Sequence, residues 1–302
     1  MSLIVASALI IALGVLIWYR NGSGRNIYDV DQPGNDTLCH SESRFAVIGD
    51  YGEAGRPLEE VAALIDSWQP DFIVTVGDNN YPNGAANTID GNIGRYFSDY
   101  IHPYRGQYGL GGVENRFFPA LGNHDWRTAG AQPYLDYFTL PGNEWYYDVQ
   151  KGAAHLFILD SNKQEADGRS ADSIQARWLS QQMAASDAAW KIVVLHHAPY
   201  SSSKEHGSQP IVQWDFAGMG AAAVLAGHDH TYERLQRDGI LYFVNGLGGR
   251  RKIYPFAAPI EGSAVRYNQE YGAMLVTLTE NCINFSFYNR SAILLDSETN
   301  DH

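Results

Sequence analysis

The sequence predicts an α/β fold, in which buried parallel strands alternate with helices. The run from 72 to 76 contains only apolar or β-branched residues and lies between Pro70 and Gly77, which is typical of a buried strand. A second short apolar run, 45–48, is separated from it by a segment, 57–68, whose apolar residues recur at helical spacing. Strand, helix and strand in this order predict a right-handed βαβ unit with parallel strands.

The remaining elements follow from the same patterns. Further strands are predicted at 117–121, 145–149, 155–159, 190–195, 221–226, 240–244, 273–279 and 283–288, and a second helix at 173–185. The strands 145–149 and 155–159 have no helix between them and are expected to pair antiparallel, while the last two strands form a closing hairpin. With 302 residues, of which 45% are apolar, the chain is long enough for one large core.

The amino-terminal part predicts export. Residues 3–18 are almost all apolar, so 1–20 is expected to be a signal peptide or a membrane anchor helix; a buried core helix fits poorly, because no polar face interrupts the run. Arg20 follows the run and no basic residue precedes it, which conflicts with export under the positive-inside rule. A true start farther upstream would remove this conflict. Residues 21–43 are expected to be a linker and 44–302 the catalytic domain, which would be secreted, periplasmic or anchored outside the cytoplasm.

Charge and cysteine content limit the functional classes. The formal net charge of −13 argues against nucleic acid as a partner, since phosphate backbones need a basic surface. An anionic substrate would have to be neutralised by something other than side-chain charge. Cys39 and Cys282 are too few for a disulfide framework or a thiolate zinc site, so they form either one bridge or two buried free thiols.

Polar side chains at strand ends predict a metal centre. Five predicted strands end in such residues: Asp50; Asp78 with Tyr81; Asn123 with His124; His196 with His197; and His228 with His230. Each one alone is typical of a helix cap or a surface residue, but five loops of this kind favour a shared site. Oxygen and imidazole ligands without thiolate suit Zn, Fe, Mn or Mg. Because there are more ligands than one cation needs, we expect two cations that share the carboxylate of Asp78.

A glycine-rich segment follows the strand 240–244. The residues 245–249 resemble a dinucleotide fingerprint only weakly, since no helix opens after them and the basic segment 250–252 follows. A tight loop beneath the site is the preferred interpretation.

The strand-end motifs also resemble a known family. The segments in order are Gly49-Asp50-Tyr51-Gly52, Gly77-Asp78-Asn79-Asn80-Tyr81, Gly122-Asn123-His124-Asp125, Val194-Leu195-His196-His197 and Gly227-His228-Asp229-His230. This series is similar to the calcineurin-like metallophosphoesterase superfamily and, within it, to the small, tartrate-resistant purple acid phosphatases. Most of the superfamily has a histidine at the position of Gly52, whereas purple acid phosphatases replace that ligand with a tyrosine, here Tyr81.

The resemblance implies a fold, a reaction and a set of ligands. The fold would be a four-layer α/β/β/α sandwich with two mixed sheets, and the reaction would be phosphomonoester hydrolysis by a metal-bound hydroxide, as in acid phosphatases. The cofactors would be two metal ions, Fe(III) with Fe(II), Zn or Mn. The first ion would take Asp50, Asp78, Tyr81 and His230, and the second Asp78, Asn123, His197 and His228. His197 is preferred to His196 because the family's ligand precedes a proline by two positions, as His197 precedes Pro199.

The resemblance also assigns residues around the metals. His124 and His206 would be catalytic, stabilising the phosphoryl oxygens and protonating the leaving group. Asp125 would orient His124 or cap a helix, and His196 would lie behind the ligands. The expected partner is a small phosphorylated substrate. Two other interpretations are a phosphodiesterase or nucleotide hydrolase on the same metals, and an anchored binding protein with a degenerate site.

Overall fold

The computed structural model describes Cys39 and residues 43–301. The expected signal peptide or anchor, 1–20, and nearly all of the expected linker lie outside the described residues. Among the described residues, no helix is long and apolar enough to span a membrane. The first strand begins at Ser43, one residue before the expected start of the domain.

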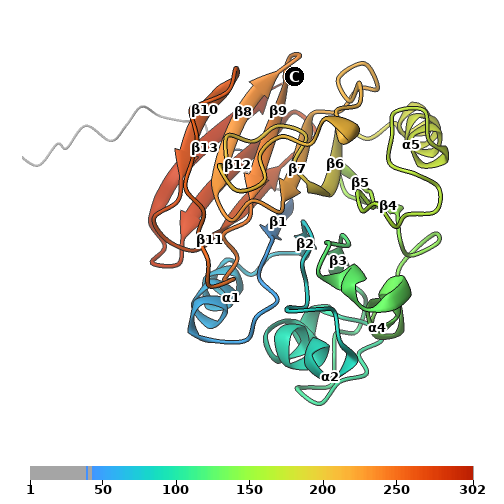
Figure 1. Ribbon diagram of the computed structural model, residues 1–302, viewed down its shortest axis with the longest axis vertical. Helices are drawn as coiled ribbons and strands as arrows, with labels where there is room; N and C mark the ends of the chain where they lie inside the picture. Colours follow the sequence, from blue (N-terminus) through green and yellow to red (C-terminus); the bar gives the residue numbers. More distant parts are fainter. Residues whose placement is uncertain (1–38, 40–42, 302) are drawn as a thin grey trace, which may run out of the picture. The chain divides into compact units, whose positions relative to one another are not determined.

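The first sheet has six strands in the order β13-β12-β11-β1-β2-β3 (Figure 1). Its strands are β1 (Ser43–Ile48), β2 (Phe72–Thr75), β3 (Phe117–Pro119), β11 (Gly272–Leu278), β12 (Cys282–Asn289) and β13 (Leu294–Asp301). Strands β1, β2 and β3 run parallel, and α1 (Arg56–Trp68) connects the first two, so the predicted parallel βαβ unit is confirmed. Strands β11, β12 and β13 continue the sheet antiparallel.

The second sheet has seven strands in the order β10-β8-β9-β7-β6-β5-β4. Its strands are β4 (Tyr147–Lys151), β5 (Ala154–Ile158), β6 (Trp190–His197), β7 (Ala223–Gly227), β8 (Tyr232–Arg237), β9 (Ile240–Asn245) and β10 (Ser263–Tyr267). Strands β5, β6, β7 and β9 run parallel. Strands β4 and β5 pair antiparallel, as predicted.

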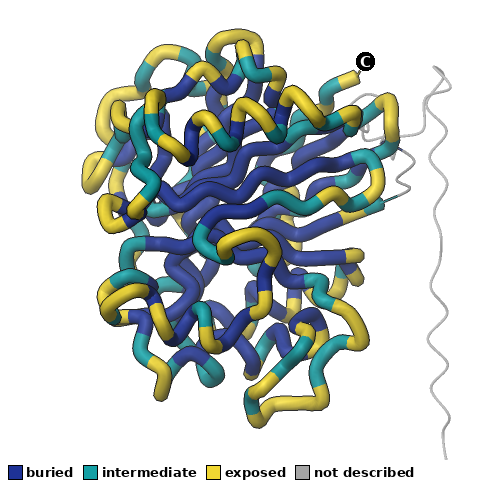
Figure 2. Tube along the Cα trace, turned by 90° about the vertical axis from the view of Figure 1, so that its right-hand side faces the viewer, coloured by how far each residue is buried: buried dark blue, intermediate teal, exposed yellow. Residues whose placement is uncertain are grey.

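Aromatic contacts join the two sheets face to face. Phe243 on β9 packs against Phe285 on β12 with ring centroids 4.8 Å apart, and Tyr232 on β8 stacks on Phe287 of β12 at 4.0 Å. Burial of such large side chains is the main favourable contribution to folding. Figure 2 shows the buried strands between exposed loops and helices.

Successive side chains of β6 belong to two different hydrophobic cores, the one between the two sheets and a second one. Ile192 and Val194 belong to the cluster shared by the sheets, whereas Val193 and Leu195 pack with α5 (Ile174–Ala185). Successive residues of a strand point to opposite faces, so α5 covers the outer face of the second sheet. Helix α1 packs against β11 of the first sheet. In Figure 1, α5 lies beside β4 to β6, while α1, α2 and α4 gather near β1 to β3. The predicted layered α/β sandwich is confirmed.

Some elements were not predicted. The helical elements that were not predicted are all short. They are α2 (Ala86–Ile89), a π-helical turn (Asp90–Gly94), α3 (Arg95–Phe97) and α4 (Gln132–Tyr137), with 3₁₀ turns at Ser98–Tyr100, Asp125–Arg127, Ala129–Ala131 and Pro210–Val212. They are too short to show helical periodicity. The expectation that the β11–β12 hairpin closes the chain was wrong, because the edge strand β13 follows it. Its sequence is largely polar and only partly buried, so it carries little apolar pattern.

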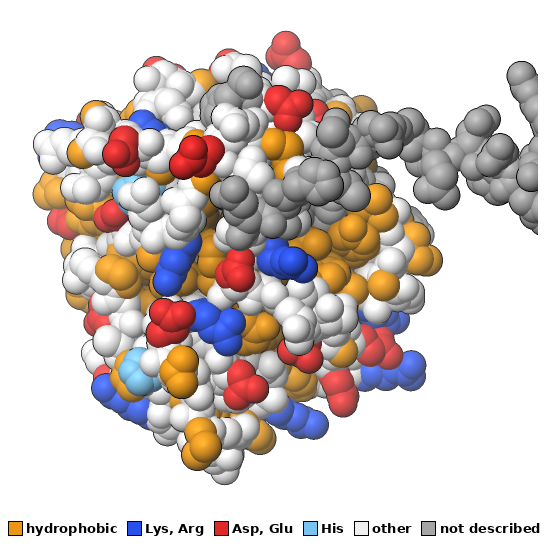
Figure 3. Space-filling view, turned by 180° about the vertical axis from the view of Figure 1, so that it is seen from behind, with side chains coloured by type: hydrophobic (Ala, Val, Ile, Leu, Met, Phe, Trp, Pro, Cys, Tyr) orange, Lys and Arg blue, Asp and Glu red, His pale blue; other side chains and the backbone are white. Residues whose placement is uncertain are grey.

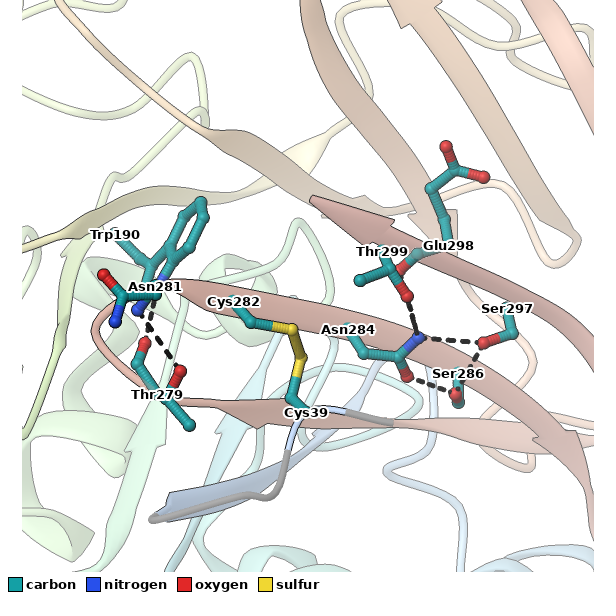
Figure 4. Close-up of a disulfide and its surroundings, with 10 residues drawn as sticks. All are labelled: Cys39, Trp190, Thr279, Asn281, Cys282, Asn284, Ser286, Ser297, Glu298 and Thr299. Atoms are coloured by element: carbon teal, nitrogen blue, oxygen red, sulfur yellow. Dashed lines mark hydrogen bonds between the residues drawn. A yellow bond between two sulfur atoms is a disulfide. The ribbon is translucent and has the colours of Figure 1, made fainter. Parts of the chain in front are cut away.

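A disulfide joins Cys39 to Cys282, across a sequence separation of 243 residues (Figure 4). Of the two alternatives that the sequence left open, one bridge or two free thiols, the structure therefore shows the bridge. Cys282 opens β12, which is the neighbour of β11 and β13. Next to the bridge, the side chain of Asn284 donates to Ser297 and Thr299 of β13, so the covalent link attaches to a hydrogen-bonded strand pair.

Charges of both signs occur together on the surface. On the part of the face in Figure 3 that the described residues form, acidic and basic side chains are interspersed with apolar and neutral ones.

Candidate metal centre

The predicted ligands gather where the parallel strands of both sheets end. Asp50 follows β1, Asp78 follows β2 and Asn123 follows β3, while His196 and His197 are the last two residues of β6 and His228 follows β7. Loops at the carboxyl ends of parallel strands meet at one edge, which is why ligands bind there in α/β proteins. The carboxyl groups of Asp50 and Asp78 are almost completely buried.

One group of ligand atoms surrounds the hydroxyl of Tyr81. This hydroxyl donates to Asp78 Oδ2 at 2.7 Å and lies 3.3 Å from Asp50 Oδ1 and 3.3 Å from His230 Nε2. Nδ1 of His230 donates to the carbonyl of Lys252, which leaves Nε2 free to face the carboxylates. Burial and the charges of Asp78 and Asp50 raise the pKa of Tyr81 well above its usual value, so the phenol keeps its proton unless a strongly polarising cation replaces it.

A second group surrounds Nε2 of His196. This atom lies 3.1 Å from Asn123 Oδ1, 3.2 Å from His228 Nδ1 and 3.5 Å from Asp78 Oδ1. Asp50, Asp78 and His196 offer ligand atoms that all lie within 4.8 Å of one another. Burial lowers the pKa of His196, but the charges of Asp78 and Asp50 outweigh it and raise that pKa overall. The centre therefore attracts positive charge.

The two adjacent histidines of β6 make different contacts, and the assignment of His197 as a ligand stays a prediction. His196, not His197, lies beside Asp78, and its Nδ1 donates to the carbonyl of Val76 at 2.9 Å. Nδ1 of His197 instead lies 2.9 Å from the hydroxyl of Ser161. Both rings lie near His228, with centroid distances of 4.9 Å for His196 and 4.5 Å for His197. The β6–β7 pairing is irregular between Val194 and His197, a feature that the proline spacing in the sequence does not reveal.

The backbone at the centre is strained. Asp50, Asp78 and His228 have φ angles of 52°, 55° and 70°, in the left-handed region that residues other than glycine seldom adopt. Such strain costs about 1–3 kcal/mol per residue and is common at functional sites. A Cβ on Gly227 would lie 2.6 Å from Asp50 Oδ2, and one on Gly122 would collide with Asp78. These motif glycines allow the backbone to approach the carboxylates.

The two expected catalytic histidines border the ligands. The backbone N–H of His124 donates to Asp78 Oδ1 at 2.8 Å, and its Nε2 lies 3.9 Å from Asp78 Oδ2. Burial lowers the pKa of His124, although Asp78 partly opposes this effect. The exposed ring of His206 stacks on His228 with centroids 3.9 Å apart.

Asp125 does not orient His124. Its carboxylate accepts from the backbone of Gly122 at 2.8 Å and from the side chain of Asn79 at 2.9 Å, which joins the loops after β2 and β3. His124 is oriented by Pro82, whose carbonyl accepts from Nδ1 at 2.6 Å. The proposed orienting role of Asp125 was therefore wrong: its carboxylate is buried beneath the turn and does not face the histidine.

Sequence reasoning missed several supporting residues. Asp229 accepts from Ser201 and from the backbone of His206, and so anchors the loop that carries that histidine. Tyr254 stacks on His230 at a centroid distance of 4.2 Å. Ser161 follows β5, so the strand-end rule applied to Asp50 and Asp78 would have found it. For Tyr254, which lies in a loop without a motif, the sequence carries no such signal.

The glycine-rich segment forms a loop beside the site, as expected. A Cβ on Gly246 would lie 2.9 Å from Asp50 Oδ2. The backbone N–H of Arg250 donates to the carbonyl of Asp50 at 3.0 Å, and its guanidinium lies over the ring of Tyr81 at 4.5 Å. The loop supports the predicted ligand Asp50.

Comparison with known proteins identifies the family. The model of the calcineurin-like phosphoesterase family matches residues 43–232, well over half of the chain. The chain belongs to the calcineurin-like phosphoesterase family. It is 23% identical over 317 residues to purple acid phosphatase 7 of Arabidopsis thaliana, covering 95% of this chain and 94% of that protein. It is 25% identical over 252 residues to tartrate-resistant acid phosphatase type 5 of Rattus norvegicus, covering 70% and 74%.

Two solved structures share the fold. A purple acid phosphatase from yellow lupin seeds superposes with a TM-score of 0.69 at 18% identity, over 86% of this chain and 53% of the other, so the chain spans about half of the lupin enzyme. GAP50, described as the anchor in the inner membrane complex of Plasmodium, gives a TM-score of 0.65 at 18% identity, over 86% and 88%. At these identities the likeness concerns the fold alone. The predicted family and its enzyme class, metal-dependent phosphoric ester hydrolase, are confirmed.

Proposed function

We propose that this phosphoesterase is a binuclear-metal phosphomonoesterase of the purple acid phosphatase type. The observation that carries the proposal is the position of Asp78 between two groups of ligand atoms. Its Oδ2 faces Tyr81, and its Oδ1 faces His196. A carboxylate that presents one oxygen to each group is suited to bridging two cations.

The residues present fit two such ions. The first would take Asp50, Asp78, Tyr81 and His230, and the second Asp78, Asn123, His196 and His228. His196 and His230 each donate through Nδ1 to a main-chain carbonyl, which holds the Nε2 lone pair toward the site. The family resemblance favours Fe(III) with Fe(II), Zn or Mn. Bound ions would neutralise the phosphate and lower the pKa of a water molecule.

The chain's own residues would bind the ester and move the proton. His124 lies next to Asp78 on the ligand side and would hold a phosphoryl oxygen. His206 is exposed above His228 and would donate a proton to the departing alcohol. Asp229 keeps His206 in place through its backbone N–H, 3.2 Å away.

The disulfide supports export. Bridges such as Cys39–Cys282 form and persist mainly in oxidising compartments. We therefore place the domain outside the cytoplasm, with a small phosphorylated molecule as its substrate. Anchoring through 1–20 is a further part of this proposal.

The test is hydrolysis of a monoester and a diester by the purified, metal-loaded protein, together with metal analysis. We expect two metal ions per chain and faster hydrolysis of the monoester. Asp78→Ala should lose both ions, whereas Asp187→Ala, an exposed aspartate, should keep them. Faster hydrolysis of the diester would favour a phosphodiesterase. A protein that binds no transition metal and hydrolyses neither ester would favour the binding-protein interpretation.

A further inference from the structure

The loop that carries His206 has a buried base and an exposed tip. It follows β6, and its ends meet, since the backbone N–H of Gln209 donates to the carbonyl of Ala198 at 3.0 Å. Residues 201–203, all of them serine, are buried at the base, whereas residues 204–206 at the tip are exposed. The position of the His206 ring therefore depends on how the buried base is held.

Glu233 of β8 holds the middle of this base. Its Oε2 accepts from the backbone N–H of Ser202, and its Oε1 accepts from the hydroxyls of Ser202 and Ser263, all at 2.6 Å. The side chain is completely buried, and within residues 43–301 it forms no ion pair. A buried carboxylate is costly unless hydrogen bonds satisfy it, so these donors fix its place. Because Ser263 opens β10, the carboxylate ties the loop to two strands of the second sheet.

A second segment, 257–260, packs against the same serine. The backbone N–H of Ala257 donates to the carbonyl of Ser202 at 2.8 Å, and the backbone N–H of Ile260 donates to its hydroxyl at 3.1 Å. That hydroxyl in turn donates to Glu233. Ser202 is thus the point at which the loop, the segment 257–260 and β8 meet.

The loop is held from the stretch of chain that also carries two proposed metal ligands. Residues 228–233 contain those ligands together with Asp229 and Glu233. Asp229 accepts from the hydroxyl of Ser201 at 2.7 Å and from the backbone N–H of His206 at 3.2 Å. Adjacent serines of the loop therefore bind two carboxylates of one short segment, which fixes the loop relative to the ligands.

We propose that Glu233 is a positioning residue for His206. By fixing Ser202, it keeps the imidazole stacked on His228, within reach of the oxygen of the departing alcohol. This inference rests on the proposed function, in which His206 donates the proton. When water attacks phosphorus, the P–O ester bond breaks with its electron pair on the alcohol oxygen, which a simple alcohol can accept only with a proton. The weakly basic 4-nitrophenolate leaves without one, so Glu233 should affect alkyl phosphates selectively.

The kinetic test compares glycerol 2-phosphate with 4-nitrophenyl phosphate as substrates of the metal-loaded protein. Glu233→Ala should lower kcat for the glycerol ester about thirtyfold and for the nitrophenyl ester less than about twofold, with KM and metal content unchanged. Glu233→Gln should restore the ratio of the two kcat values, because an amide can accept from the backbone of Ser202 and donate to the hydroxyls. Glu261→Ala removes an exposed glutamate and is the control.

Two further variants separate positioning from general damage to the fold. Ser202→Ala, a milder change, removes one of the hydrogen bonds to Glu233 and should lower the ratio about threefold. His206→Ala should lower it at least as far as Glu233→Ala, and the double variant no further, since residues that act as a unit are not additive. Equal losses on both esters, or losses that multiply in the double variant, would overturn the inference while the phosphatase stands.

Amide hydrogen exchange examines the loop without any turnover. The backbone N–H groups of His206 and Gly207 both donate to Asp229. In Glu233→Ala they should exchange about tenfold faster than in the unaltered protein, and in Glu261→Ala at the same rate. Exchange that Glu233→Ala leaves unchanged would overturn the inference. Faster exchange in a protein that hydrolyses neither ester would support the role of Glu233 in holding the loop and contradict the proposed function.

Discussion

The main-chain oxygen of Val76 lies 2.9 Å from Nδ1 of His196. A carbonyl only accepts, so Nδ1 carries a proton, and Nε2 faces Asn123 Oδ1, 3.1 Å away, and Asp78 Oδ1, 3.5 Å away. This relationship supports His196, rather than His197, as the imidazole ligand from β6.

The first prediction therefore concerns these two neighbours. His196→Ala should reduce the metal content from two ions to about one per chain, since a lost ligand removes a large part of the binding free energy. His197→Ala should keep both ions. Mass-spectrometric metal analysis measures the difference, with the exposed His102→Ala as a control. If His197→Ala loses an ion and His196→Ala does not, the family's proline spacing identifies the ligand correctly and the assignment to His196 fails.

A second prediction concerns the colour of the iron-loaded protein. The hydroxyl of Tyr81 lies within hydrogen-bonding distance of Asp78 and close to Asp50 and His230. When it loses its proton to ferric iron, it should give a visible charge-transfer band. Tyr81→Phe should remove the band, whereas the exposed Tyr108→Phe should retain it. A band that persists in Tyr81→Phe, measured by absorption at equal iron content, would exclude the phenolate as its source.

A third prediction uses the buried carboxyl of Asp160. Burial raises its pKa to about 7, although hydrogen bonds from Asn162 and Trp126 act in the opposite direction. In the unfolded chain an aspartate loses its proton near pH 4. Between these values the unfolded state binds fewer protons, so the free energy of unfolding falls as pH rises, by up to about 1.4 kcal/mol per pH unit.

Replacement of Asp160 tests this pH dependence. Asp160→Asn cannot titrate, so it should destabilise the protein more at about pH 5, where the native carboxyl is protonated, than at about pH 8. Urea unfolding at both pH values gives the comparison, with the exposed Asp187→Asn as control. An equal loss of stability at the two pH values would mean that Asp160 titrates alike in the folded and unfolded states.

A fourth prediction concerns the disulfide. Because it closes a loop of 243 residues, its reduction should lower the free energy of unfolding by about 3–5 kcal/mol. The double variant Cys39→Ser/Cys282→Ser should show the same loss without reductant and no further response to it. Both forms should keep their metal, because the bridge is attached to β12 and not to a ligand loop. Unfolding midpoints that do not move on reduction would contradict the prediction.

The ligand loops could be predicted because each follows a buried apolar strand. Asp50, Asp78 and Asn123 stand two to four residues after such strands, and parallel strands bring their ends to one edge whatever the details of packing. The choice between His196 and His197 could not be predicted in the same way. It depends on tertiary contacts: Nδ1 of His196 donates to the carbonyl of Val76, and Nδ1 of His197 lies beside the hydroxyl of Ser161.

Other features depend on tertiary contacts that leave no sequence pattern. Arg127 lies after β3, and Lys163 and Arg169 lie in the loop after β5; these segments line the same cavity. The polar strand β8 lacks an apolar run, although the turn Asp238-Gly239 that joins it to β9 is a common hairpin signal. The sequence left the pairing of Cys39 with Cys282 undecided because β12 and the chain before β1 meet only in the folded sheet.

The bridge at Cys39 also changes how mechanical load enters the domain. A pull on the chain upstream would reach Cys282 through two sulfur atoms before it reached the hydrogen bonds of β1. Cys282 begins a strand that is paired on both sides, with β11 and β13, so the force would be distributed over hydrogen bonds to two neighbouring strands. With the disulfide intact, such a force would not act first on β1, the strand that precedes Asp50.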